Sequence, residues 1–306
     1  MLRLPADDLR HKLAEAKRKL FEVRRRRIPP GRDEKVLTAW NGLMIDAFAR
    51  AAQVLDDPRY AATAGRAAEF LLSTMRTGDG KLMRTWSAGS QPKLNAYLED
   101  YSFMVDALVS LYEATFEPRW IESALDLARV MIDQFWDESE GGFYFTGRDH
   151  EALIARTKDL LDNATPSGNA MAATALLRLA KLTGNRDLEE KAAKTLRLAR
   201  GLMAERSIGC GQMLLALDFH LGPVQEFAVV GDPAGEEARR VLRSVRGQFR
   251  PNKVVAMKSH HDDAAERVVP LLAGKKATGG VTTYICEDFV CRKPLLGATA
   301  VEVALR

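Results

Sequence analysis

A helical pattern that recurs along the first two-thirds of the chain constrains its fold more than any other feature. Between residues 36 and 51 the apolar residues fall at steps of three and four, the spacing of the buried face of a helix. A turn at Asp56-Asp57-Pro58 leads into a second helical pattern, which ends at Gly78-Asp79-Gly80. The same plan recurs at residues 97–135 and 168–203, so the sequence predicts a series of helical hairpins.

The repeat also predicts how the hairpins pack. Arg59, Arg119 and Arg186 hold the same place in successive turns, which gives a repeat of roughly 60–67 residues. Because one hairpin cannot bury its apolar face alone, such repeats stack side by side in an inner and an outer layer of helices. A closed ring of six hairpins would need roughly 360 residues. The helical region, about residues 9–220, is shorter, so we expect an incomplete array.

The pattern changes after residue 222. Strand-like segments at residues 224–230, 253–257 and 282–286 alternate with helical segments at residues 234–249 and 262–272. We therefore predict two domains: a mainly helical array at residues 1–222 and a small α/β unit at residues 223–306.

Composition and charge narrow the classes of function. The 306 residues include 45 basic and 41 acidic side chains, interspersed along the chain, so the net charge of +4 gives no support to a nucleic-acid partner. No apolar run reaches the ~18 residues of a membrane span, and the N-terminus lacks the apolar segment of a signal peptide. We therefore expect no membrane association and a cytoplasmic location.

Neither a metal nor a cofactor is expected. The three cysteines, Cys210, Cys286 and Cys291, match no zinc spacing and are too few for a disulfide framework. His260 and His261 have no further ligand nearby in the sequence, which favours an exposed loop pair over a metal site. The motifs of nucleotide-binding loops and of the common hydrolases are also missing.

Three polar clusters hold equivalent places in the repeat, each just before an inner helix. They are residues 32–35 leading to Trp40-Asn41, residues 98–101, and residues 162–169. Because equivalent positions of stacked hairpins lie at the same end, we expect the clusters to meet at one mouth of the array. Carboxylates can act there as general acid and base, amides bind sugar hydroxyls, and aromatic rings stack on sugar rings.

The sequence thus predicts a carbohydrate site at this mouth. The candidate catalytic carboxylates are Asp33, Asp100 and Asp162. The candidate substrate-binding residues are Lys35, Trp40, Asn41, Glu99, Tyr101, Ser167 and Asn169.

Structural alternatives exist for the same residues. Asp, Ser and Asn are preferred helix caps, so capping explains each of the three aspartates as well as a site does, and explains Ser167 better than nucleophilic catalysis does. Trp40 lies on the apolar stripe of its helix, which favours a place in the core. Asn41 has less of a structural explanation, because asparagine inside a helix needs a hydrogen-bond partner.

Two further features favour ordinary structural interpretations. Residues 24–27 are four arginines at the end of the first helical pattern, where cations complement the helix dipole, so a solvated helix end is favoured over a phosphate or nucleic-acid site. Cys286 and Cys291 are separated by four residues rather than the two of a thioredoxin-type motif, which leaves a redox function as a weaker alternative.

Taken together, the motifs resemble one family. Residues 32–44, 98–101, 141–144 and 165–169, with the segments 284–286 and 291–294, resemble the spermatogenesis-associated protein 20 family and its bacterial relatives. The resemblance covers nearly the whole chain. It implies an (α/α)6 toroid of the six-hairpin glycosidase type, similar to sugar epimerases and unsaturated glucuronyl hydrolases, which in full-length members follows a thioredoxin-like domain. It also implies that this chain corresponds to the C-terminal part of such a protein, without the toroid's first hairpins.

Four functions remain open at this point. The leading hypothesis is a sugar hydrolase that uses the carboxylates at the mouth. The second is a non-catalytic toroid that binds a glycan or a protein, with the thioredoxin-like or N-terminal portion of a family protein as partner; an exposed apolar face on the first helices would favour it. Epimerisation is disfavoured, because none of His11, His150, His220, His260 and His261 lies in the clusters. The fourth is a redox accessory protein.

Overall fold

The computed structural model describes residues 5–151, 154–260 and 262–305, so His261 lies outside the described residues. The chain divides into two compact units, residues 1–35 and residues 36–306. No helix in the described ranges is both long and apolar enough to cross a membrane.

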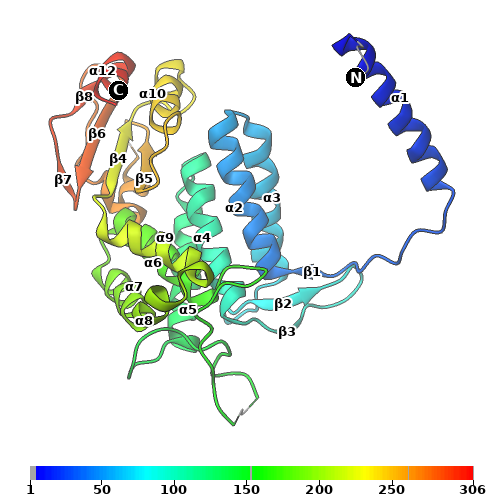
Figure 1. Cartoon of the computed structure of the whole chain (residues 1–306). Helices are drawn as coiled ribbons and strands as arrows, with labels where there is room; N and C mark the ends of the chain where they lie inside the picture. The colour runs from blue at the N-terminus through cyan, green and yellow to red at the C-terminus, as the bar shows by residue number, and fades with distance from the viewer. Residues whose placement is uncertain (1–4, 152–153, 261, 306) are drawn as a thin grey trace. The chain divides into compact units, whose positions relative to one another are not determined.

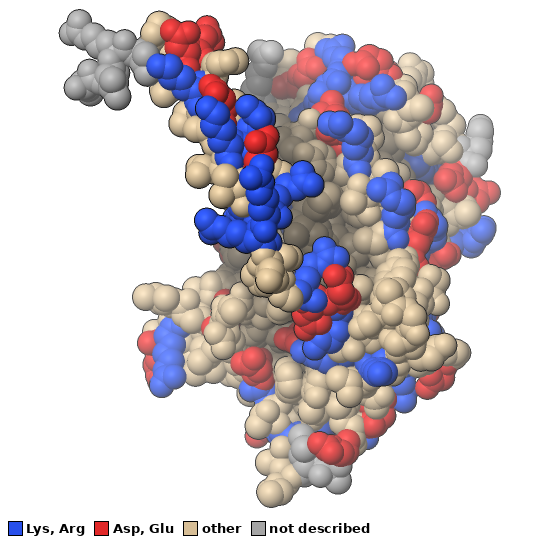
Figure 2. All heavy atoms as spheres, turned by 90° about the vertical axis from the view of Figure 1, so that its right-hand side faces the viewer, with Lys and Arg blue, Asp and Glu red and all other residues tan. Residues whose placement is uncertain are grey.

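The first unit contains one helix, α1 (Ala6–Arg25), followed by an extended segment. None of the side chains of α1 is buried, and Lys and Arg side chains cover much of it (Figure 2). Asp7 and Asp8 in its first turn and Arg24 and Arg25 in its last turn complement the helix dipole. The arginines at residues 24–27 are exposed, as a solvated helix end requires.

The second unit begins with the hairpins that the repeat predicts. They pair α2 (Thr38–Leu55) with α3 (Pro58–Thr74), α4 (Leu98–Thr115) with α5 (Arg119–Phe135), and α6 (Gly168–Thr183) with α7 (Arg186–Leu198). Local sequence sets the turns. Asp57 accepts a hydrogen bond from the Arg59 N–H and is followed by Pro58 at the first helical position. Gly184 ends α6 at φ +68°, a left-handed conformation that glycine adopts without strain.

The hairpins form two layers (Figure 1). Helices α2, α4 and α6 lie side by side as inner helices, and α9 (Gly211–Leu221) packs against α6 after the short helices α8 (Arg200–Glu205) and η1 (Ser207–Cys210). Their partners α3, α5 and α7 form the outer layer. The predicted fold class, a mainly α array of helical hairpins of the toroid type with a small α/β unit, is confirmed.

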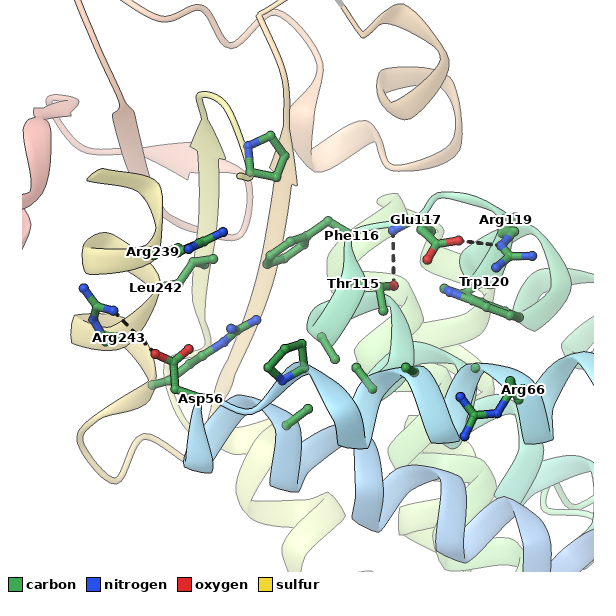
Figure 3. A pocket seen from close by; sticks show the side chains of 18 of the residues that line it. Asp56, Arg66, Thr115, Phe116, Glu117, Arg119, Trp120, Arg239, Leu242 and Arg243 are labelled. Carbon is green, nitrogen blue, oxygen red and sulfur yellow. Dashed lines mark hydrogen bonds and ion pairs between the residues drawn. The ribbon is translucent and has the colours of Figure 1, made fainter. Parts of the chain in front are cut away.

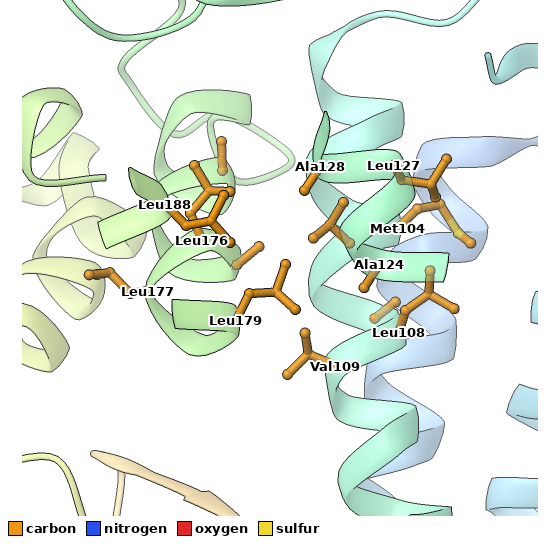
Figure 4. Close-up of a cluster of buried hydrophobic side chains, with 14 of the residues drawn as sticks. Met104, Leu108, Val109, Ala124, Leu127, Ala128, Leu176, Leu177, Leu179 and Leu188 are labelled. Carbon is orange, nitrogen blue, oxygen red and sulfur yellow. The ribbon is translucent and has the colours of Figure 1, made fainter. Parts of the chain in front are cut away.

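The core lies around α4, the central helix of the array. Figure 4 shows Met104 and Leu108 of α4 facing Leu127 of α5, with Leu179 of α6 approaching from the other side. Each of these side chains is fully buried. Burial of one such side chain contributes about 1.5–3 kcal/mol, so this cluster contributes substantially to the stability of the array.

A small antiparallel sheet lies in the connections where the inner helices begin. Its strands are β1 (Val36–Leu37), β2 (Met83–Trp86) and β3 (Lys93–Asn95), in the order β1-β2-β3. The apolar pattern that begins at Val36 is therefore partly strand, and α2 begins two residues later than the spacing predicts.

The C-terminal part is the α/β unit that the sequence predicts. Its five-stranded sheet has the order β5-β4-β6-β7, with β8 paired to β6. The pair β4–β5 is parallel and the pair β4–β6 is antiparallel. Its elements are β4 (Gln225–Val230), α10 (Glu236–Arg246), β5 (Lys253–Lys258), α11 (Asp263–Val268), η2 (Pro270–Leu272), β6 (Thr282–Glu287), β7 (Val290–Cys291), β8 (Leu295–Leu296) and α12 (Gly297–Ala304).

The sheet packs on the helical array through one of its faces. Ala228, Val254 and Ala256 belong to the same hydrophobic cluster as the inner helices, whereas Phe227 and Val255 point to the other face, which α10 and α12 cover. Successive residues of a strand point to opposite faces, which explains the alternation. Because one core spans both parts, the domain boundary near residue 222 stays a prediction.

Candidate functional site

The Asp100 carboxylate joins the beginnings of α2 and α4. Its Oδ1 accepts a hydrogen bond from the Ala39 N–H at 2.9 Å, in the first turn of α2. Its Oδ2 accepts from the N–H of Tyr97, the residue before α4, at 2.9 Å, and from Arg84 Nη1 at 3.1 Å. Asp100 is fully buried, and these three donors are the hydrogen-bond partners of its carboxylate. Its contacts are those of a helix cap that bridges two helices.

Asp100 shares its cationic partner, Arg84, with Glu99, whose carboxylate is more exposed. Burial raises the pKa of Asp100 to about 6, although the Arg84 guanidinium and the two backbone N–H groups favour the ionised form. Arg84 also pairs with Glu99 Oε1 at 2.9 Å and lies over the ring of Tyr97, 4.7 Å from its centre. The Glu99 side chain is 22% exposed. Of the two carboxylates, Glu99 is therefore the one that a ligand in solution can reach.

Asp162 joins α6 to α9 in the same manner. Its Oδ1 accepts from the Ser167 N–H at 2.9 Å, just before α6, and its Oδ2 accepts from the Gln212 N–H at 2.8 Å, near the start of α9. Ser167 caps α6 through a hydrogen bond that its Oγ accepts from the Ala170 N–H. The capping alternative thus accounts for the contacts of both residues.

Three further candidate residues form hydrogen bonds with the backbone of neighbouring segments: Asn169, Tyr101 and Asn41. Buried Asn169 accepts from the Phe143 N–H at 2.7 Å and donates to the Phe143 carbonyl at 2.9 Å. The Tyr101 hydroxyl accepts from the Leu82 N–H at 2.8 Å, and burial raises the pKa of Tyr101 to about 12. Asn41 Nδ2 donates to the Leu37 carbonyl at 2.8 Å, which supplies the partner that a helical asparagine needs.

The place of Trp40 corrects the expectation that it belongs to the core. Its side chain is 63% exposed, while Ala39 and Ile45 on the same helix are buried. The apolar stripe of α2 is wider than the face that α3 and α4 cover, so part of it faces solvent. Trp40 follows Ala39, whose N–H binds Asp100, so the exposed indole lies at the end where α2 and α4 begin.

Two of the predicted clusters lie at one end of the array, together with residues 39–41. Gly168, at the start of α6, faces Leu98 and the Glu99 N–H so closely that an added Cβ would lie 3.1 and 3.4 Å from them. Ala39 and Met171, from the first turns of α2 and α6, pack with Phe103 of α4.

Asp33 and Lys35 belong to the first unit, so their convergence with these clusters stays a prediction. Both are exposed and pair at 3.1 Å, and the hydrogen bond from Lys35 lowers the pKa of Asp33.

A buried network of charges between the inner helices was missed by sequence reasoning. Arg178 of α6 pairs with Asp106 at 2.6 Å and with Glu113 at 2.7 Å, both on α4. Burial, and after it the charge of Asp106, raises the pKa of Asp46 on α2. A signal was present, because Asp106, Ser110 and Glu113 follow one another at helical spacing within an otherwise apolar segment.

Two of the three cysteines are paired, which the sequence analysis did not predict. Cys286 and Cys291 face each other on β6 and β7 and form a disulfide, and Cys210 is buried and free. A redox function for the pair stays a prediction. Among the described residues, no group of three or more His, Cys, Asp or Glu side chains is placed to hold a metal ion.

The sequence of this chain is similar to that of longer proteins. No family model matches the chain. Spermatogenesis-associated protein 20 of Rattus norvegicus is 34% identical over 291 residues, which are 90% of this chain and 36% of that protein. The Homo sapiens protein of the same name is 32% identical over 303 residues, which are 95% of this chain and 38% of that protein.

Solved structures show weaker likeness. A cellobiose 2-epimerase from Bacillus thermoamylovorans has a TM-score of 0.46 at 17% identity, over 54% of this chain and 44% of that one. A family 76 glycoside hydrolase from a bovine Bacteroides thetaiotaomicron strain has a TM-score of 0.49 at 12% identity, over 89% of this chain and 55% of that one. The sequence match extends over nearly the whole chain but spans less than two-fifths of the relatives' own length. Over that shared part, the chain belongs to the spermatogenesis-associated protein 20 family.

Proposed function

We propose that this chain is a carbohydrate-binding part of a helical toroid, and that the sugar binds where α2 and α4 begin. One observation carries the proposal: the exposed indole of Trp40 and the partly exposed Glu99, paired with Arg84, occur at the same end of neighbouring helices. An aromatic ring stacks on the apolar face of a sugar, while a carboxylate and a guanidinium bind its hydroxyls.

Asp100 acts in this proposal as a positioning residue. Its carboxylate holds the Ala39 N–H, next to Trp40, and Arg84, which pairs with Glu99. It thereby connects the two groups that contact the sugar. Three donors occupy the buried Asp100, and two backbone N–H groups occupy Asp162, which favours binding over hydrolysis by these carboxylates. Asp33 remains the candidate catalytic carboxylate of the hydrolase alternative.

The test is sugar binding by the purified 306-residue chain. Calorimetric titration with cellobiose and mannobiose measures affinity, and release of reducing sugar measures hydrolysis. Trp40→Ala and Glu99→Gln are expected to weaken binding about tenfold or more, because they remove the stacking ring and a charged hydrogen-bond acceptor. Met44→Ala is the matched control, since Met44 is exposed one turn further along α2.

The outcomes separate the alternatives. Unchanged affinity in Trp40→Ala and Glu99→Gln would refute this binding site. Hydrolysis that disappears in Asp33→Asn and survives in Met44→Ala would replace binding with the hydrolase hypothesis.

A second candidate function, protein binding, is favoured by a row of exposed apolar side chains on α2. Trp40, Met44, Val54 and Leu55 are all exposed, and their spacing places them along one side of the helix. The occupant that we propose is an apolar helix from the portion of the longer family proteins that this chain does not span. Co-purification with that portion of the rat protein should be lost in Met44→Glu and kept in Glu99→Gln; retention in Met44→Glu would refute it.

A further inference from the structure

A cavity of about 650 Å³ lies at the opposite end of the array, where α2 and α4 end. The ends of α2 and α4 and the beginnings of α3 and α5 form one wall, and α10 of the α/β unit forms the other. Figure 3 shows Arg239, Leu242 and Arg243 of α10 on one side and Phe116, Trp120 and Arg66 on the other. The volume is that of a site for a small metabolite rather than for a bare ion.

The cavity has an excess of positive charge. It is lined by five arginines and by the three acids Asp56, Glu69 and Glu117. All three acidic side chains form ion pairs with arginines that line the cavity. Glu69 and Glu117 pair with Arg119 at 2.8 and 2.6 Å, and Asp56 pairs with Arg243 at 3.4 Å. Among the described residues, the other three arginines, Arg66, Arg239 and Arg246, have no ion-pair partner in the cavity or elsewhere.

Two buried N–H donors of the lining also lack acceptors within the described part of the chain. One is Nε of Arg246, whose Nη2 donates to the Glu113 carbonyl. The other is Nε1 of Trp120, a side chain that is more than nine-tenths buried. Burial lowers the pKa of Arg246 to about 10, so the guanidinium is still charged at neutral pH. A buried donor without an acceptor costs free energy, and a ligand with oxygen acceptors would remove that cost.

Helix α10 contributes arginines to the cavity from a single face, which could bind one anionic group. Arg239, Arg243 and Arg246 follow one another at steps of four and three, so they lie on one side of the helix, and all three line the cavity. Guanidinium groups bind phosphate oxygens through paired hydrogen bonds. Ala52, Ala61, Phe116 and Leu242 add apolar surface for the organic part of a ligand.

We propose that this cavity binds a small metabolite through a phosphate group, with Arg239 and Arg246 as the anchors. The cavity and the sugar site lie at opposite ends of the same helices and share no residue. The proposal therefore does not rest on the proposed function.

The test is a titration of the full chain with inorganic phosphate, glucose 6-phosphate and AMP, with glucose and adenosine as uncharged counterparts. At least one phosphorylated probe is expected to bind, and its uncharged counterpart is expected to bind about tenfold more weakly or not at all. Failure of all three phosphate probes to bind at millimolar concentration would refute the proposal, as would equal binding of the uncharged counterparts.

Two neighbouring arginines on α10 provide a matched pair of variants. Arg239→Gln removes an anchor and should weaken binding at least about fivefold. Arg240→Gln removes the same charge from a residue outside the cavity, where Arg240 pairs with Glu302 at 2.8 Å, and should leave binding unchanged. Equal weakening by both would show that only overall charge matters and would overturn the site.

Two more variants complete the test. Trp120→Phe, which removes the unpartnered N–H, should weaken binding while the unfolding temperature verifies that the variant is folded. Trp40→Ala should not change phosphate binding; if it does, the probe binds at the other end and the assignment to this cavity is wrong.

Discussion

Arg178 of α6 and Asp106 of α4 form a buried ion pair, with 2.6 Å between Nη1 and Oδ1. The same guanidinium binds Glu113 Oε2 at 2.7 Å, and Glu113 Oε1 accepts from the Val255 N–H of β5 at 3.0 Å. One cation therefore connects two inner helices and, through Glu113, the sheet. Burial by itself would lower the pKa of Arg178, but the two carboxylates outweigh it and raise the pKa.

Arg178→Met should be strongly destabilising. The variant removes the buried cation from Asp106 and Glu113 and leaves Asp106 only its longer pair with Arg50 at 3.7 Å. Breaking a buried pair in this way costs about 3–5 kcal/mol. Urea unfolding measures the free energy. Arg197→Met, at an exposed position on α7, is the control and should change stability by less than about 0.5 kcal/mol. Similar stabilities of the two variants would show that the network contributes little.

Asp100 should make stability depend on pH between about 4 and 6. Its pKa in the folded chain is about 6, above the ordinary value of 3.8, so the folded chain holds this proton more tightly than the unfolded chain does. The contribution of Asp100 to stability therefore falls as pH rises through this window, by about 2–3 kcal/mol in total. The stability of the native chain minus that of Asp100→Asn should decrease accordingly.

Asp133→Asn, an exposed site, controls for the change of net charge in that experiment. A difference that stays constant from pH 4 to pH 7 would contradict the raised pKa of Asp100.

Asp162→Ala should lower stability by about 2 kcal/mol, because it removes acceptors for two backbone N–H groups at the starts of α6 and α9. Asp159→Ala is a matched control three residues earlier, where the side chain is exposed and only the backbone carbonyl forms hydrogen bonds. Sugar binding per folded molecule should be the same in both variants. Loss of binding in Asp162→Ala alone would instead place Asp162 in the site.

Thiol titration of the denatured chain should find one free thiol, Cys210, and three after reduction. The double substitution Cys286→Ser and Cys291→Ser should cost about 2 kcal/mol, because the disulfide closes a loop of only a few residues. Reductant should destabilise the native chain but not the double variant. Three thiols before reduction would show that the disulfide does not form.

Helices and their ends were readable from the sequence because they depend on residues close together in the chain. The stripe at residues 36–51, the turn at Asp57-Pro58 and the Ser167 cap all involve partners within a few positions. The hairpin array and the α/β unit followed from these local signals. The exposure of Trp40 did not follow from local signals. The helices that pack against an apolar stripe determine which side of it is covered.

The candidate functional sites also depend partly on local sequence and partly on packing. Sequence patterns alone establish that polar clusters precede the inner helices and that the hairpins repeat. Only packing places Asp100 and Asp162 at helix ends, leaves Trp40 exposed and Glu99 partly exposed, and forms the cavity from α2, α3, α4, α5 and α10. The reason is physical: the burial of a charge and the identity of its partner depend on residues far apart in sequence, such as Arg178 and Asp106, which only packing brings together.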